Sequence, residues 1–115
     1  MSLAKKLNLK PGMTLKVVGR PASVGLDDVA TGRSAADGVL LFATTLAELD
    51  ANAAPFVDAA HADRLAWVAY PKAGQLATDL DRDILARHLE PRGIEPVRMV
   101  AVDEVWSAMR FRPAR

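Results

Sequence analysis

The chain has 115 residues, of which 15 are basic, 14 are acidic and none is cysteine. This length suits a single domain, and the lack of cysteine excludes disulfides, zinc-thiolate sites and thiol nucleophiles. A formal net charge of +1 supplies no long-range attraction for nucleic acid. No segment has the apolar length of a membrane span or the pattern of a signal peptide, so we expect a cytoplasmic protein.

The first part of the chain predicts a short helix and two strands. Residues 2–9 form the helix, which Pro11 ends, and residues 13–18 form the first strand. Residues 26–30 predict a helical turn. The apolar run at residues 39–43 is continuous rather than alternating, which is typical of a central parallel strand covered on both faces.

A long helix is expected after this strand. Thr45 and Glu48 have the spacing of a capping box, so we expect Thr45 to be the N-cap of a helix that runs to about His61. Pro55 is expected to kink this helix or to split it into two pieces. Residues 64–70 then predict the third strand.

The last third of the chain predicts one more helix and two strands. Thr78 and Asp81 repeat the capping spacing ahead of an apolar stripe that reaches Leu89. Residues 96–102 and 105–112 predict the strands. The connection between them is too short for a parallel crossover, so these strands form a hairpin or turn a corner between neighbouring positions.

This order of elements predicts one α/β domain at residues 1–115. The expected architecture is a three-layer sandwich with a mostly parallel five-stranded sheet and one antiparallel strand near its C-terminal end. Trp67 and Trp106 are expected to anchor the core, and each indole N–H then needs an acceptor.

The chain resembles the class I methyltransferase variant of the Rossmann-like fold, with the middle of that fold left out. The resemblance lies in the turn and strand at residues 10–19, in the strand that begins after Asp37, and in the final strand pair. It implies a Rossmann-like sandwich and, as cofactor, S-adenosylmethionine. Two departures argue against this cofactor. GRPA stands at residues 19–22 in place of a glycine-rich loop, and no second strand ends in an acidic residue that would hold a ribose. We therefore expect no bound cofactor.

Three blocks look more closely like a family of short bacterial proteins that carries no assigned function. They are WVAYPK at residues 67–72, TDLDRD at 78–83 and VDEVWSAMRF at 102–111. This resemblance implies a standalone bacterial domain and supplies no activity.

The candidate site follows from the expected sheet. Ligands of open parallel sheets bind beyond the carboxyl ends of the strands, so the residues after the first three strands should line one crevice. These residues are Arg20, Ser23, Thr44, Thr45 and Lys72. Cations and hydroxyls beside a helix N-terminus suit a phosphate, a carboxylate or an acidic peptide. The alternative is that Arg20 and Lys72 are solvated loop charges and that Thr45 is only a helix cap.

The remaining polar residues offer no catalytic arrangement. Ser23 and Ser107 have no visible histidine and acid partners, and His61 and His88 are expected at the surface. The acidic residues in the block at 78–83 are spaced two apart, so on a helix they point to different faces and we expect no metal site.

The chain ends in a group of arginines. Arg110, Arg112 and Arg115 are expected to form a solvated tail rather than a binding patch.

These observations favour a non-catalytic binding or interaction module whose crevice holds an anionic small molecule or an acidic segment of a partner. The alternative is a small transferase-like enzyme that uses a nucleotide-containing cofactor such as S-adenosylmethionine. We expect neither nucleic acid nor a membrane as partner. A homodimer is slightly favoured over a monomer, because an exposed antiparallel sheet edge invites pairing.

Overall fold

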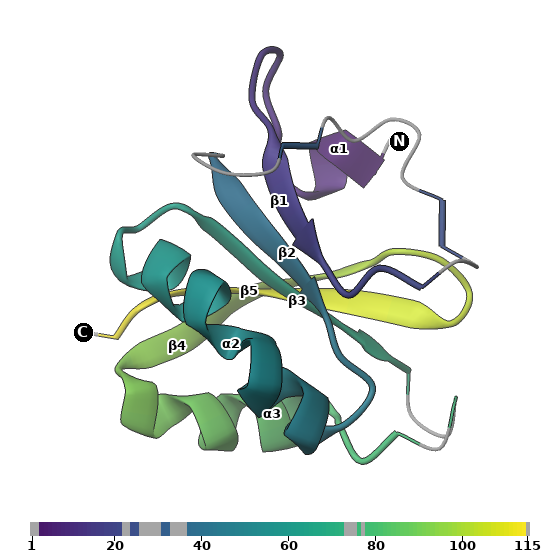
Figure 1. The fold of residues 1–115 in the computed structure, drawn as a ribbon, viewed down its shortest axis with the longest axis vertical. Coiled ribbons are helices and arrows are strands. Elements are labelled where there is room, and N and C mark those ends of the chain that lie inside the picture. Colours follow the sequence, from purple (N-terminus) through teal and green to yellow (C-terminus); the bar gives the residue numbers. More distant parts are fainter. Residues whose placement is uncertain are drawn as a thin grey trace.

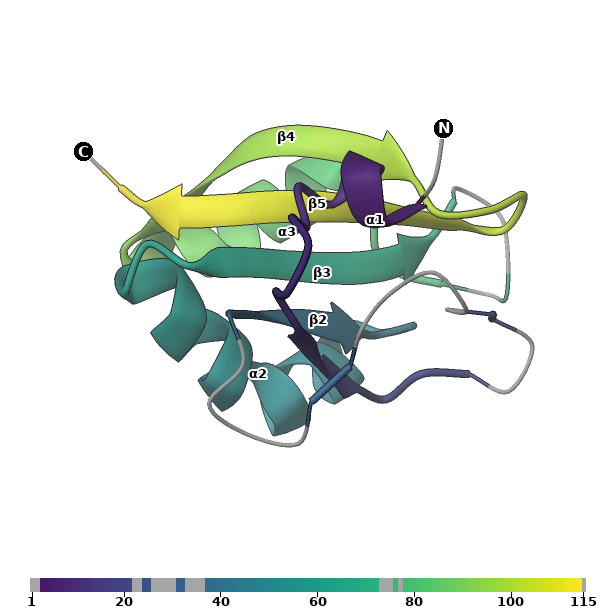
Figure 2. The same cartoon turned by 90° about the horizontal axis from the view of Figure 1, so that it is seen from above.

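The computed structural model of the protein describes residues 3–21, 24–25, 31–32, 37–72, 76 and 78–114. These residues form a five-stranded sheet with two long helices over one face (Figures 1 and 2). The helices are α1 (Leu3–Lys6), α2 (Leu46–His61) and α3 (Arg82–Leu89), which continues into the 3-10 turn η1 (Glu90–Arg92). The strands are β1 (Leu15–Val18), β2 (Gly38–Phe42), β3 (Leu65–Pro71), β4 (Ile94–Ala101) and β5 (Trp106–Pro113).

The sheet is mixed, so the predicted mostly parallel sheet is wrong. The strand order is β1-β2-β3-β5-β4. Strands β1, β2 and β3 are parallel, whereas β5 is antiparallel to both of its neighbours, β3 and β4. Parallel and antiparallel pairings are therefore equal in number. The cause is the short loop at residues 102–105, which makes β5 fold straight back along β4 and insert beside β3.

The two faces of the sheet are covered differently, which also departs from the expected Rossmann-like sandwich. Helices α2 and α3 lie over one face (Figure 1). Phe56 of α2 and Leu85 of α3 belong to the core cluster between these helices and the strands. On the other face, Leu7 and Val24 pack against Trp67 and Trp106. Both long helices thus share one face, and the segment around the single-turn helix α1 closes the other.

Strand β2, which lies inside the sheet next to its middle strand β3, and the two expected core tryptophans are buried as predicted. β2 is buried along its whole length and pairs in parallel with β1 and β3. The Trp67 indole Nε1 donates a hydrogen bond of 3.1 Å to the Leu7 carbonyl, which ties the N-terminal segment to the sheet. Trp106 is buried and makes an edge-to-face contact with Phe42 at 5.3 Å between ring centroids.

Helix α2 is continuous, so the expected split at Pro55 does not occur. A proline inside a helix removes the single hydrogen bond that its own N–H would donate. Ala53 and Phe56, on either side of Pro55, remain packed in the core, and this burial holds both halves in one helix. The N-cap is Thr45, as predicted, and its side chain accepts a hydrogen bond from the Glu48 N–H at 3.2 Å.

Helix α3 begins later than the capping pattern predicts. Its N-cap is Asp81, whose Oδ1 accepts a hydrogen bond from the Ile84 N–H at 2.8 Å. Thr78 is engaged elsewhere, because its hydroxyl donates to the Thr44 carbonyl at 2.6 Å. A tertiary contact thus takes up the residue that the local pattern assigns to the cap.

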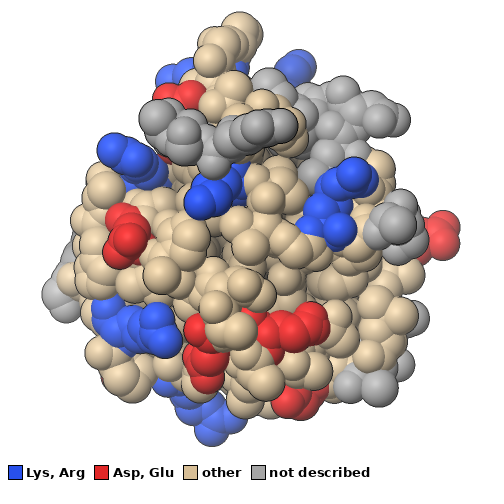
Figure 3. Space-filling model, in the orientation of Figure 1, with Lys and Arg blue, Asp and Glu red and all other residues tan. Residues whose placement is uncertain are grey.

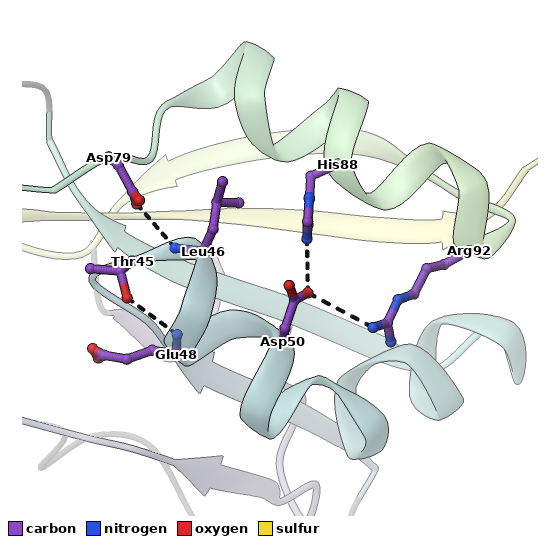
Figure 4. A network of polar contacts seen from close by, with 7 residues as sticks. All are labelled: Thr45, Leu46, Glu48, Asp50, Asp79, His88 and Arg92. Carbon is purple, nitrogen blue, oxygen red and sulfur yellow. Dashed lines mark hydrogen bonds and ion pairs between the residues drawn. The ribbon is translucent and has the colours of Figure 1, made fainter.

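Polar contacts link α2 to α3 and η1 (Figure 4). Asp50 of α2 accepts a hydrogen bond of 2.8 Å from His88 Nε2 of α3 and lies 3.8 Å from the Arg92 guanidinium.

The helical turn expected at residues 26–30 lies outside the described residues. In the described part of the chain, no helix combines the length and apolarity needed to cross a membrane.

Candidate functional site

The carboxyl ends of β1, β2 and β3 lie at one edge of the sheet, as their parallel order requires. Gly19 follows β1 at φ 74°, and a Cβ at this position would lie 2.9 Å from the Phe42 carbonyl oxygen. Arg20, the next residue, donates from Nη1 to the Val24 carbonyl at 2.6 Å. Its guanidinium therefore closes the loop after β1. Ser23, also a predicted site residue, lies outside the described residues.

The N-terminus of α2 is occupied by the chain's own polar groups (Figure 4). Thr45 caps the helix, and the Leu46 N–H donates to Asp79 Oδ1 at 3.0 Å. The Thr44 carbonyl accepts the hydrogen bond from Thr78. A carboxylate, that of Asp79, thus already lies where the helix N-terminus would attract an anion.

Other acidic side chains lie on the same side of the molecule as this contact. On the face in Figure 3, acidic side chains gather over the region where α2 approaches α3. The surface beside the α2 N-terminus is therefore a poor place for a second anion.

Lys72 lies apart from these residues, in a cavity of about 350 Å³ that it shares with Tyr70, Met99, Ser107 and residues 81–83. Neither Arg20, Thr44 nor Thr45 lines this cavity. The structure thus keeps Thr44 and Thr45 together and gives Lys72 a separate environment. Ligand binding by these residues stays a prediction.

Tyr70, which lines the Lys72 cavity, has a pKa shifted from its ordinary value. Its hydroxyl donates to the Met99 Sδ at 3.1 Å, and the side chain is otherwise buried in the core. Burial raises the pKa of Tyr70, the nearby Arg82 charge lowers it, and the Asp81 charge raises it further.

A larger cavity, of about 650 Å³, lies beside the amino ends of the parallel strands, and we name it the amino-edge pocket. It is placed there because Leu65 begins β3 and Asp37 directly precedes β2. Its charged lining consists of Lys5, Lys10, Arg64 and Arg110 with Asp37 and Asp63. The remainder of its lining is Asn8, Leu9, Met13 and Leu65.

Two helix ends shape the rim of the amino-edge pocket. Asn8 follows α1 at φ 64°, and Asp63 follows α2 at φ 57°. In each case the next N–H closes the helix end, from Leu9 to the Ala4 carbonyl and from Arg64 to the Ala59 carbonyl, both at 2.9 Å. Asn and Asp tolerate this left-handed conformation better than other side chains that carry a Cβ. The rim is thus fixed by backbone hydrogen bonds.

Arg110 contributes a buried polar atom beside the amino-edge pocket. Its Nε is buried and has no hydrogen-bond partner among the described residues. In the sheet it lies beside Trp67 on one side and Arg98 on the other. Within the part of the chain that the structure describes, neither arginine forms an ion pair. Two like charges on adjacent strands repel each other, so a bound anion would relieve a real electrostatic cost.

No protein-family model, curated protein or solved structure matches this chain. The resemblances seen in its sequence therefore rest on the quoted motifs.

The amino-edge pocket is not predicted from the sequence, and the predicted solvated tail is wrong for Arg110, which lies half-buried in β5. One signal was available in the period-two alternation of β5. Trp106, Ala108 and Arg110 share a face, so a strand with the two apolar residues buried also draws the arginine inward. No local pattern indicates Lys10 or Arg64, because only the tertiary fold brings them to Arg110.

A metal site finds no support in the described residues. Among them, no group of three or more histidine, aspartate or glutamate side chains is arranged to hold a metal ion.

Proposed function

We propose that the protein is a non-catalytic binding domain for an anionic small molecule, and that the amino-edge pocket holds this ligand. The observation that carries the proposal is Arg110, a half-buried cation at a cavity of about 650 Å³ that lies opposite Arg98 in the sheet and forms no ion pair with a described residue. Two like charges on adjacent strands repel each other. An anion in the pocket would offset this repulsion.

Charge and size support the same proposal. Basic side chains outnumber acidic ones in the lining by four to two. One of the acids, Asp37, already accepts a hydrogen bond from the Thr14 N–H at 2.9 Å, so it has a structural role. The volume lies within the range of roughly 300–1,000 Å³ that is usual for small-molecule sites. The pocket therefore suits a small anion better than a long acidic segment.

The test is thermal unfolding with a panel of anions at low ionic strength. The panel contains carboxylates, phosphate, nucleotides, S-adenosylmethionine and an acidic peptide. We expect at least one small anion to raise Tm, because a ligand at a hundred times its Kd adds about 2.7 kcal/mol of stability. Arg110→Gln should abolish the response. Arg112→Gln is the matched control, since Arg112 lies on the same strand and pairs with Glu95 outside the pocket.

A double variant distinguishes the amino-edge pocket from the carboxyl ends of the strands. The double variant Arg20→Ala and Lys72→Ala should respond to anions as the unmodified protein does. If it loses the response while Arg110→Gln keeps it, the anion binds at the carboxyl ends of the strands and the amino-edge pocket is not the site. A response to S-adenosylmethionine alone would instead favour the transferase-like enzyme.

A further inference from the structure

We propose that Met99 is a modification site, at which a peroxide forms methionine sulfoxide and the Tyr70 hydroxyl then donates a hydrogen bond to the new oxygen. Met99 lines the Lys72 cavity rather than the amino-edge pocket, so this site is separate from the proposed anion site.

Met99 is the most accessible of the three methionines that the structure describes. Its exposed fraction is 50%, whereas that of Met109 is 2%. Met13 is partly buried against the core, and its sulfur accepts a hydrogen bond of 3.5 Å from the Lys10 N–H. The cavity that Met99 lines has a volume of about 350 Å³, well above the roughly 30 Å³ that a water molecule occupies in the liquid. A small oxidant such as hydrogen peroxide therefore reaches Met99 in the folded protein.

The Tyr70 hydroxyl lies where it can stabilise the oxidised side chain. It donates to the Met99 Sδ at 3.1 Å, and the tyrosine as a whole is only 4% exposed. A thioether sulfur is a weak acceptor, whereas the oxygen of a sulfoxide carries partial negative charge and is a strong one. The gain is larger for a buried donor, because a hydrogen bond is stronger away from water. Oxidation thus replaces a weak hydrogen bond inside the fold with a stronger one.

The oxidation needs a peroxide and no other reactant. A lone pair of the Met99 sulfur attacks one peroxide oxygen, and the S–O bond forms as the O–O bond breaks. The second oxygen leaves with the bonding electron pair and takes up the proton of the transferred oxygen, which gives water from hydrogen peroxide. The sulfur loses two electrons and the peroxide gains them, so the product is the sulfoxide.

The position of Met99 in the sheet lets the folded protein accept a sulfoxide. Oxidation of a core methionine disrupts packing, because it turns an apolar side chain into a polar one. Met99 lies on the outer strand β4, and half of its surface remains in contact with water. Met109 belongs to the core cluster and would have to leave it to become oxidised. We therefore expect oxidation of the folded chain to favour Met99 over Met109.

The first experiment treats the folded protein with hydrogen peroxide and follows each methionine by peptide mass mapping. Met99 should gain one oxygen atom at least about tenfold faster than Met109, and faster than Met13. In urea, where the chain is unfolded, these differences should disappear. Oxidation of Met13 or Met109 as fast as Met99 in the folded protein would overturn the proposal.

The second experiment measures the hydrogen bond to the sulfoxide through Tyr70, the only tyrosine of the chain. A stronger acceptor stabilises the protonated hydroxyl, so the absorbance titration of Tyr70 should move to higher pH after peroxide treatment. Met99→Leu should show no such movement. Met13→Leu is the matched control and should respond as the unmodified protein does. Circular dichroism checks that both variants fold.

The tyrosine titration also distinguishes a built site from an exposed side chain that merely reacts. If Met99 is oxidised first but the titration stays in place or moves to lower pH, Tyr70 does not hold the sulfoxide and the proposal fails. A movement to higher pH that persists in Met99→Leu would place its cause elsewhere and would also overturn it. Neither experiment uses an anionic ligand, so the result is independent of the proposed function.

Discussion

Two buried nitrogen atoms on neighbouring strands differ in whether a described residue accepts a hydrogen bond from them. The indole Nε1 of Trp67 finds an acceptor in the Leu7 carbonyl, which is the usual fate of a buried donor. The Nε of Arg110, on the adjacent strand, has none in the part of the chain that the structure describes. Trp67 therefore holds the N-terminal segment in place, whereas the Nε of Arg110 adds no such contact with the described residues.

The hydrogen bond of Trp67 should be measurable through stability. In Trp67→Phe the Leu7 carbonyl loses its donor, and we expect the free energy of unfolding to fall by about 1–3 kcal/mol, in addition to the loss from the smaller ring. Urea denaturation measures this change. Trp106→Phe is the control, because it removes the same ring volume from the same core cluster, where the indole N–H donates no hydrogen bond to a described residue. Equal losses in the two variants would contradict the role assigned to the Leu7 contact.

Tyr70 should make stability depend on pH in the alkaline range. Burial raises its pKa above the ordinary value of 10.0, so the folded state keeps a proton that the unfolded state releases. The resulting stability is fully present below about pH 10 and is lost as the pH rises through the folded-state pKa. Tyr70 is the only tyrosine of the chain, so absorbance titration reports it directly.

The matched variant for this prediction is Tyr70→Phe. Its stability should decline less between about pH 9 and pH 11 than that of the unmodified protein, since other groups titrate in both. A tyrosine absorbance titration centred at or below the free value would contradict the effect of burial.

At the scale of elements, the start of a helix can be predicted from the sequence where neighbouring residues form the cap. It cannot be predicted where a residue distant in the chain binds the expected cap instead. Thr45 and Glu48 act within one helical turn, so the start of α2 could be predicted. The start of α3 could not, because Thr78 bonds to the Thr44 carbonyl, far away in the chain. Arg110 shows the same limit for the site. Its place on β5 is visible in the alternation of residues, whereas the cavity beside it exists only after Lys10 and Arg64 are brought close.

The tight pairing of β2 with β3 depends on Gly38. A Cβ at this position would lie 2.2 Å from the Leu65 carbonyl oxygen and 2.9 Å from Leu15 Cδ2. The nearest atom is backbone and cannot move aside without opening the sheet, so Gly38→Ala should cost about 3 kcal/mol or more. Gly25→Ala is the control, because nothing lies within 4 Å of its added methyl group. A Tm for Gly38→Ala within a degree or so of that control would show that the strands can separate without cost.

For the whole molecule, the outer strands β1 and β4 are where another copy of the chain could add a strand to the sheet. The β1 edge is partly covered, since Leu15 forms a bridge with Thr31 and accepts a hydrogen bond from the Gly32 N–H at 2.9 Å. The β4 edge is longer and exposes Val97 and Met99 by 40% and 50%. Apolar side chains on an open strand are the usual start of edge-to-edge pairing. Two local features of β4, a proline and an irregular register, oppose it.

Pro96 and the register shift between it and Arg98 make β4 a poor template for another strand. Proline offers no N–H, and a bulge twists the strand away from a flat partner. We therefore expect a monomer in sedimentation velocity, in place of the homodimer that the sequence alone slightly favours. Pro96→Val restores the missing donor and should produce a concentration-dependent dimer. Adding Met99→Lys to that variant places a charge on the same edge and should return the protein to a monomer. A dimer of the unmodified chain that Met99→Lys leaves intact would show that the copies associate through another surface.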